Sequence, residues 1–243
     1  METDILIVNL NCLDHTKKLV KMVEQQTDKN YKLTIIDQNS SEKGTMEFLN
    51  ECSNKNISII KNNKNIPLNR LWNEFRINSS CEILSLLNND ILIPKNFISD
   101  NIKIFETHEN VGVVIHVTNN LNFQLNLEKT DYIILKEKVR QGWDFSIRKK
   151  DFVKIPDLLD FYCGDDFLFE NIYNNGKEVA LCLSSPIIHL LSQTRKNNKI
   201  IINRNPIKDI LNYKLLGYKH YLDIPSLCNI DPPRNLYVWC ILE

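Results

Sequence analysis

Short apolar runs recur through the first half of the sequence, and segments with helical spacing separate them. Val, Ile and Leu fill consecutive positions of these runs rather than alternate ones, which is typical of strands buried on both faces. A strand, a helix and a second strand follow one another from the N-terminus, so we expect a largely parallel sheet. The sequence therefore predicts an α/β protein, with strands at residues 4–10, 31–37, 57–61, 82–94 and 111–117.

Apolar residues three or four positions apart predict the helices that flank this sheet. Gly176 suits the left-handed position that ends one of them. The pattern is weaker between residues 119 and 138, where alternation indicates a small antiparallel edge at 123–127 and 132–135. A further strand is expected at 178–183, and helices are expected at 16–26, 40–52, 67–75, 96–108, 165–175 and 206–216.

Length and composition favour one main domain. With 243 residues, of which 43% are hydrophobic, the chain can bury a substantial single core. We expect this domain to span residues 1–194. The remaining residues, 195–243, are expected to form an extension whose helix and apolar tail pack on the domain or on another subunit, as in a homodimer.

Charge and cysteine content narrow the class of protein. Thirty basic and thirty acidic residues give no net charge, so the composition provides no general attraction to nucleic acid or to an anionic membrane. No basic segment precedes an apolar core at the N-terminus, and no stretch reaches the roughly 18 apolar residues of a membrane span. Seven scattered cysteines without a CxxC pair indicate buried free thiols. The expectation is a soluble, cytoplasmic protein.

Polar residues follow the predicted strands at the points where the strands end. Open parallel sheets bind ligands outside the carboxyl ends of their strands, so these residues are candidates for a binding site. No glycine-rich phosphate loop is present, which argues against dinucleotide redox enzymes and P-loop hydrolases. Phosphate groups would need a metal ion or side chains here. The strand-end candidates are Asn9, Asn11, Asp37, Asn39, Ser40, Asn62, Asn63, Asn65, Asn88, Asn89 and Asp90.

Asp90 ends a polar triplet that interrupts the apolar segment 82–94. Hard cations such as Mg²⁺ bind one or two protein carboxylates together with substrate phosphate oxygens, so a cation and a diphosphate are the expected ligands. The alternative is that Asp90 only caps a turn before Pro94. Likewise, Asp165 and Asp166 open a predicted helix, where they can act as an N-cap and a helix-dipole partner.

The order of these motifs resembles that of a known family. DILIVNLN, LTIIDQNSS, an Asn-rich turn before a helix, LSLLNND, a GDD tripeptide before a helix and a later His follow one another between residues 4 and 194. This order is similar to that of the inverting family 2 glycosyltransferases of the GT-A fold, particularly the rhamnosyltransferase-like branch with an NND metal motif. The resemblance implies a Rossmann-like sheet flanked by helices. It also implies transfer of a sugar from a UDP- or dTDP-sugar donor to a glycan acceptor.

The resemblance implies roles for individual residues. Asp90 and His189 would hold Mn²⁺ or Mg²⁺, although a lone His beside an apolar run is more often structural. Asp166 falls on the second acid of the family's ED dipeptide and would be the catalytic base. The later acid of the family's EDxD motif is Leu168 here, so Asp165 is named with Asp166 as an alternative base.

The remaining implied roles concern the donor and the acceptor. Trp143 and Asp144 would bind the acceptor, although core packing explains Trp143 equally well. Asp37 would contact the base or ribose, but it is equally a turn residue that bonds to nearby amides. The implied nucleotide-sugar contacts are Asn9, Asp37, Asn39, Asn65, Asn73, Asn88 and Asn89.

Two other functions remain open from the sequence. A nucleotidyltransferase would also present a carboxylate and a metal ion to a phosphate, and it would release pyrophosphate. A catalytically degenerate glycan-binding or assembly protein is the non-enzymatic alternative, since the triplet 88–90 contains a single carboxylate.

Overall fold

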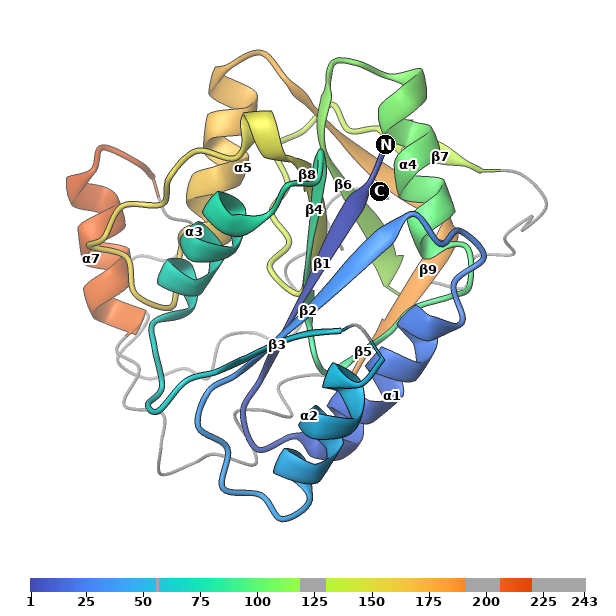
Figure 1. The fold of residues 1–243 in the computed structure, drawn as a ribbon. Helices are drawn as coiled ribbons and strands as arrows, with labels where there is room; N and C mark the ends of the chain where they lie inside the picture. Colours follow the sequence, from blue (N-terminus) through green and yellow to red (C-terminus); the bar gives the residue numbers. More distant parts are fainter. Residues whose placement is uncertain (56, 119–129, 191–205, 220–243) are drawn as a thin grey trace.

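The computed structural model describes residues 1–55, 57–118, 130–190 and 206–219. Helices cover both faces of one central sheet (Figure 1). The elements are β1 (Thr3–Asn9), α1 (Leu13–Glu24), β2 (Tyr31–Asp37), α2 (Thr45–Ser53), β3 (Ser58–Lys61), α3 (Leu68–Asn78), β4 (Ile83–Asn88), β5 (Ile91–Leu92), α4 (Phe97–Thr107), β6 (Val111–Thr118), β7 (Tyr132–Ile134), β8 (Asp144–Arg148), the 3₁₀ helix η1 (Lys149–Asp151), α5 (Gly164–Asn174), β9 (Glu178–His189) and α7 (Pro206–Leu215).

The strand order is β3-β2-β1-β4-β8-β6-β9-β5, and β7 pairs with β9 off this path. Strands β1 to β4 run parallel to one another, and β9 runs parallel to β6. Three strands run in the opposite direction: β8, which lies between β4 and β6, and β5 and β7, which pair with β9. The expected α/β fold with a mostly parallel sheet is therefore confirmed.

The core has two halves, one on each face of the sheet. Successive strand residues point to opposite faces, so Leu6 joins one cluster while Ile5 and Ile7 join the other. Figure 1 shows the corresponding helices: α3, α5 and α7 cover the first face, and α1, α2 and α4 cover the second. Buried residues on α1 recur at helical spacing, which is the pattern that predicted the helix.

Two features of the fold differ from the sequence expectation. The predicted strand 82–94 is two strands, because the chain turns at Asn89 and Asp90 and β5 then pairs with β9 rather than with the neighbours of β4. The antiparallel strand β8 lies inside the sheet, between β4 and β6, whereas only an antiparallel edge was expected. Asp144, which the family resemblance places at the acceptor, is the first residue of this strand.

Several smaller expectations can be compared directly. Gly176 has a φ of +68° after α5, as expected for a helix-ending glycine. Five described cysteines are buried and free, as expected. None of the described helices combines the length and apolar character that crossing a bilayer requires. The expected strand at 123–127, the boundary at 194 and Cys228 and Cys240 lie outside the described residues.

Candidate active site

The carboxyl ends of β1, β2 and β4 meet at one edge of the sheet. These strands are parallel neighbours, and their register places Asn9 opposite Asp37 and Val8 opposite Asn88. The polar residues that end the strands therefore lie side by side, as the sequence predicts.

A chain of hydrogen bonds connects these strand ends. Asn9 Nδ2 donates to Asp37 Oδ1 at 2.7 Å, and Thr16 Oγ1 donates to Asn9 Oδ1 at 2.7 Å. Asn89 Nδ2 donates in turn to Thr16 Oγ1 at 3.1 Å. Ser40 donates to both carboxylate oxygens of Asp37, through Oγ at 2.6 Å and through its backbone N–H at 3.0 Å. The chain fixes the three strand ends relative to one another, and Asp37 takes the turn-forming role that the sequence left open.

The loop after β3 is held to this edge by Gln38, which sequence reasoning missed. Gln38 Nε2 donates to Ile66 O at 2.6 Å, and its Oε1 accepts from Ile66 N–H at 3.0 Å and from Asn62 Nδ2 at 2.9 Å. Asn65 lies in this loop, and its buried Oδ1 has no hydrogen-bond partner among the described residues. Asn39 is exposed at the same edge and has a φ of +62°.

Asn73 is corrected from a donor contact to a fold residue. Its Nδ2 donates to Ile155 O at 2.9 Å, and its Oδ1 accepts from Ile155 N–H at 2.9 Å. Both functions of the side-chain amide are therefore used to join α3 to the segment before α5.

Asp90 and His189 lie together, although 98 residues separate them in sequence. The β5–β9 ladder pairs Ile91 with His189, which brings Asp90 Oδ1 to 3.4 Å from His189 Nε2. The Trp143 ring stacks on the His189 ring with centroids 5.3 Å apart and an interplanar angle of 17°. Asn88 N–H donates to Trp143 O at 2.9 Å, which attaches this segment to the end of β4.

This is the pair to which the family resemblance assigns a divalent cation. Its carboxylate oxygen and imidazole nitrogen are both ordinary ligands of divalent cations such as Mn²⁺. Within the part of the chain that is described, no group of three or more His, Cys, Asp or Glu side chains could hold a metal ion. Phosphate oxygens and water would have to complete the coordination shell.

The acidic pair lies at the first turn of α5, against the segment before β8. A Cβ atom added at Gly142 would lie 2.3 Å from Asp165 Oδ2, so this position requires glycine for the carboxylate to stay in place. A Cβ atom at Gly164 would lie 2.0 Å from Asn69 Oδ1. Asn69 Nδ2 donates to the carbonyl oxygens of Leu159 and Tyr162, which fixes the approach to α5.

Arg140 sets the charge around Asp166, and sequence reasoning missed it. Its Nε lies 3.5 Å from Asp166 Oδ1, and its Nη2 donates to Glu170 at 2.7 Å. Burial, followed by the negative charge of Asp165, raises the pKa of Asp166 to about 7, although Arg140 acts in the opposite direction. Burial also raises the pKa of Asp165. A carboxyl group with a pKa near neutrality can accept a proton effectively in a reaction at pH 7.

Residues 140–143 connect the two parts of the site. Arg140 contacts Asp166, Gly142 lies against Asp165, and Trp143 stacks on His189. The acidic pair and the Asp90–His189 pair therefore lie on the same side of the molecule and border the same short segment.

Asp144 is corrected from an acceptor contact to a buried structural residue. It is fully buried in β8, where its carboxylate accepts from Gln141 Nε2 at 2.5 Å and lies 2.7 Å from His116 Nδ1. Burial alone would lower the pKa of His116, but the hydrogen bonds to Asp144 and Cys182 raise it to about 9. A buried aspartate is thereby paired with a protonated histidine, and it is not accessible to a glycan.

Comparison with known proteins identifies a family and solved structures that share the fold described above. The profile of the family described as "Glycosyl transferase family 2" matches residues 4–171. No match was found among curated protein sequences.

Solved structures that are similar include S. aureus TarS 1-349, with 13% identity, a TM-score of 0.59 and coverage of 75% of this chain and 58% of that one. GalNAc-T7, crystallised with UDP, GalNAc and Mn²⁺, has 13% identity, a TM-score of 0.64 and coverage of 78% and 44%. The mannosyltransferase PcManGT from Pyrobaculum calidifontis, in complex with GDP-Man and Mn²⁺, has 13% identity, a TM-score of 0.59 and coverage of 75% and 56%. The match thus covers 44–58% of each of these longer proteins, and the likeness establishes the GT-A fold.

Proposed function

The chain belongs to glycosyl transferase family 2, and on that basis we propose that it transfers a sugar from a nucleoside diphosphate donor to a hydroxyl group of a glycan. One observation carries the proposal: residues 140–143 border both the Asp165–Asp166 pair and the Asp90–His189 pair. This shared segment supports the proposal, because such a transfer needs both groups of side chains near one another.

The strand-end edge is the donor side in this proposal. Asn9 and Asp37 support the edge through their hydrogen bonds, while Asn39 and Asn65 have amide groups that can contact a UDP- or dTDP-sugar. Asn88 and Asn89 lie at the end of β4, between this edge and Asp90. PcManGT was crystallised with GDP-Man and GalNAc-T7 with UDP, and this supports the proposal that a nucleotide sugar is the donor here.

Asp90 and His189 would hold Mn²⁺ or Mg²⁺ beside the donor diphosphate. A divalent cation in this position supplies Lewis-acid stabilisation of the charge that develops on the leaving phosphate. The triplet 88–90 takes the place of the metal motif, as in the rhamnosyltransferase-like branch. Trp143 orients the His189 ring by stacking on it, which limits the directions in which the imidazole nitrogen can point.

Asp166 is the proposed base, and Asp165 is its neighbour on the acceptor side. The acceptor hydroxyl oxygen attacks the anomeric carbon and forms the new glycosidic bond, while the bond from that carbon to the donor phosphate breaks. The hydroxyl proton passes to Asp166, and the nucleoside diphosphate leaves from the opposite face of the sugar. This single displacement inverts the anomeric configuration and forms no covalent enzyme intermediate.

The test is transfer or donor hydrolysis with a panel of nucleotide sugars in Mn²⁺ or Mg²⁺. We expect nucleoside diphosphate to be released by the wild type, and we expect Asp90→Ala and Asp166→Asn to lose at least about 100-fold in kcat/KM. Asp157→Asn, which alters an exposed carboxylate, should behave as the wild type. Turnover that survives both substitutions contradicts the assignment. Release of pyrophosphate from a nucleoside triphosphate would indicate a nucleotidyltransferase instead.

A further inference from the structure

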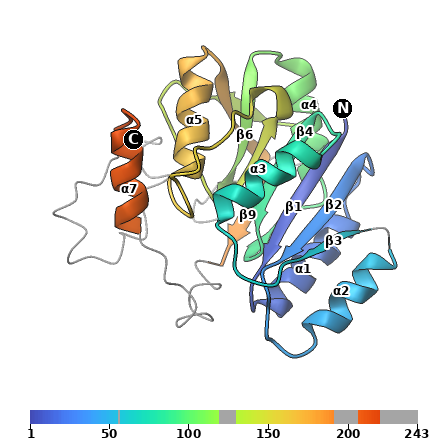
Figure 2. The same ribbon diagram turned by 60° about the vertical axis from the view of Figure 1, so that its left-hand side comes forward.

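Helix α7 lies beyond residue 171, where the family match ends, yet it packs next to the helix that carries the acidic pair. Figure 2 shows α7 beside α5, on the outer side of the domain. Tyr213 of α7 is fully buried and stacks on Tyr218 at 5.0 Å. Tyr218 in turn meets the edge of Phe167, the residue that follows Asp166, at 5.4 Å. The helix is therefore attached to the first turn of α5.

Asp209 connects α7 to the loop that leads into the acidic pair. Its Oδ1 accepts from the backbone N–H of Asp160 at 3.0 Å, and its Oδ2 accepts from those of Phe161 and Tyr162 at 2.9 Å each. The side chain is 2% exposed. Three consecutive N–H groups can converge on one carboxylate only in a defined backbone conformation, so this contact specifies the shape of the loop.

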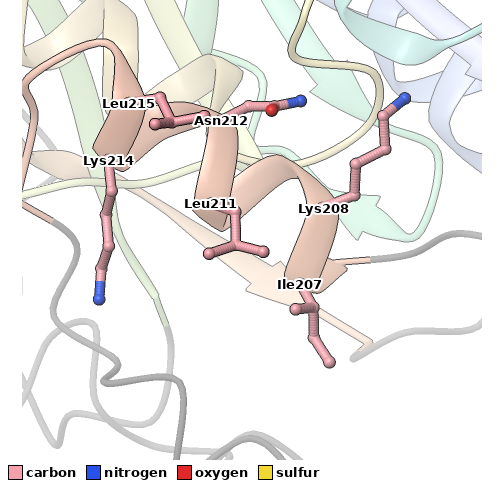
Figure 3. Close-up of a pocket in the computed structure, with 6 residues that line it drawn as sticks. All are labelled: Ile207, Lys208, Leu211, Asn212, Lys214 and Leu215. Atoms are coloured by element: carbon pink, nitrogen blue, oxygen red, sulfur yellow. The ribbon is translucent and has the colours of Figure 1, made fainter.

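The other contacts of α7 with this loop are weaker. Asn212 Nδ2 donates to Leu158 O at 2.8 Å, and Lys208 forms a surface ion pair with Asp160 at 2.6 Å. An exposed ion pair contributes little. Figure 3 shows the pocket at α7, where the Ile207 and Leu211 side chains point to a different side of the helix from those of Lys208 and Asn212. Asp209 is thus the buried member of this set of polar contacts.

The loop is followed directly by the residues that the proposed reaction uses. Tyr162 is bonded to Asp209 through its N–H and to Asn69 through its carbonyl group. Two positions later, Gly164 lies against Asn69 and begins α5, which carries Asp165 and Asp166. The direction from which α5 enters the site is therefore set at Tyr162, from one side by α3 and from the other by α7.

We propose that Asp209 is a positioning residue for transfer: it holds residues 160–162 so that Asp165 and Asp166 face the acceptor. The inference rests on the proposed function, because it assigns a role in that reaction to a residue outside the family match. Asp209 contacts neither sugar nor cation. It acts through the loop, and its replacement should change the reaction step more than donor binding.

The variants follow from the three hydrogen bonds. Asp209→Asn retains an oxygen at one position and places an NH₂ group opposite at least one backbone N–H, so the loop loses part of its support. Asp209→Glu keeps both acceptor oxygens. Leu215→Gln is the matched control, since it changes an 81% exposed residue on the same helix. Amide hydrogen exchange of residues 158–166 is measured without substrate, and kcat and the donor KM are measured below the melting temperature of each variant.

In Asp209→Asn we expect exchange at residues 160–162 to accelerate at least tenfold and kcat to fall roughly 10- to 100-fold, because small displacements of reacting groups have effects of this size. The donor KM should stay within about twofold of the wild-type value. A general loss of stability would not lower kcat while leaving the donor KM unchanged in this way. Asp209→Glu should lie between Asp209→Asn and the wild type, and Leu215→Gln should match the wild type.

Unchanged exchange in Asp209→Asn overturns the inference, as does faster exchange with wild-type kcat. Equal impairment of Asp209→Glu and Asp209→Asn would also overturn it, since the acceptor oxygens would then be unimportant. If the wild type transfers no sugar while Asp209→Asn still opens the loop, the proposed function fails and the support of the loop by Asp209 stands.

Discussion

Replacement of Arg140 by Met should move the pH dependence of turnover. The Arg140 guanidinium lies 3.5 Å from Asp166 Oδ1, and two unit charges at this distance attract by about 5 kcal/mol at an effective permittivity of about 20. That energy corresponds to about 3 pKa units. Arg140 also pairs with Glu170 and is 16% exposed, and both weaken its effect on Asp166. We therefore expect about a third of that shift in the pKa of Asp166. Loss of the cation disfavours the carboxylate, and the pKa of Asp166 should rise from about 7 to about 8 or higher.

The assay is kcat/KM between pH 5.5 and 9, which reports the ionisation of the free enzyme. Since the base must be deprotonated, the acid limb should shift upward by at least about one unit, and kcat/KM at pH 7 should fall about fivefold. Lys138→Met is the matched control, because Lys138 pairs with Glu170 at 2.8 Å. Its acid limb should stay in place. An unchanged limb in Arg140→Met refutes the reasoning, because the group that titrates would then not be Asp166.

Three further predictions concern the cation, the acceptor side and the core. Asp90→Asn should weaken Mn²⁺ binding at least about tenfold in calorimetric titrations with nucleoside diphosphate present, and equal affinity would exclude Asp90 as a ligand. Gly142→Ala should displace the Asp165 carboxylate, which lowers kcat on the order of 100-fold with little change in melting temperature; wild-type kcat would contradict this. The pKa of His116 is raised from 6.5 to about 9, so its contribution to stability is complete below pH 6.5 and is lost as the pH rises through 9. Urea denaturation should show a decrease of roughly 3 kcal/mol over that range, and His116→Gln should remove most of the slope.

The strand ends could be predicted from sequence because one rule covers them. Apolar runs of consecutive Val, Ile and Leu indicate buried parallel strands, and parallel strands bring their carboxyl ends to one edge. Asn9, Asp37 and Asn88 lie at that edge for this reason. The proximity of Asp90 and His189 was implied by the family resemblance, and the structure brings them together through the β5–β9 ladder.

Residues that act through distant contacts could not be found in this way. Arg140, Asn69 and Asp209 contact residues 159–166 only in the folded chain. Asp209 lies at least 47 residues away in sequence from the backbone N–H groups that donate to it. Periodicity identifies the buried face of a helix but not the group that the face meets. Asp144 was expected at the acceptor because of the family resemblance, and the sequence does not reveal that His116, 28 residues away, pairs with it inside the sheet.

Residues 140–143 impose a mechanical link between the two halves of the site. Gly142 and Trp143 are joined by one planar peptide unit, and consecutive Cα atoms are about 3.8 Å apart, so a shift of Gly142 also moves Trp143. An acceptor that presses Asp165 toward Gly142 would therefore also tilt the indole that supports His189. We expect acceptor occupancy and cation affinity to be linked, and such a linkage is necessarily reciprocal.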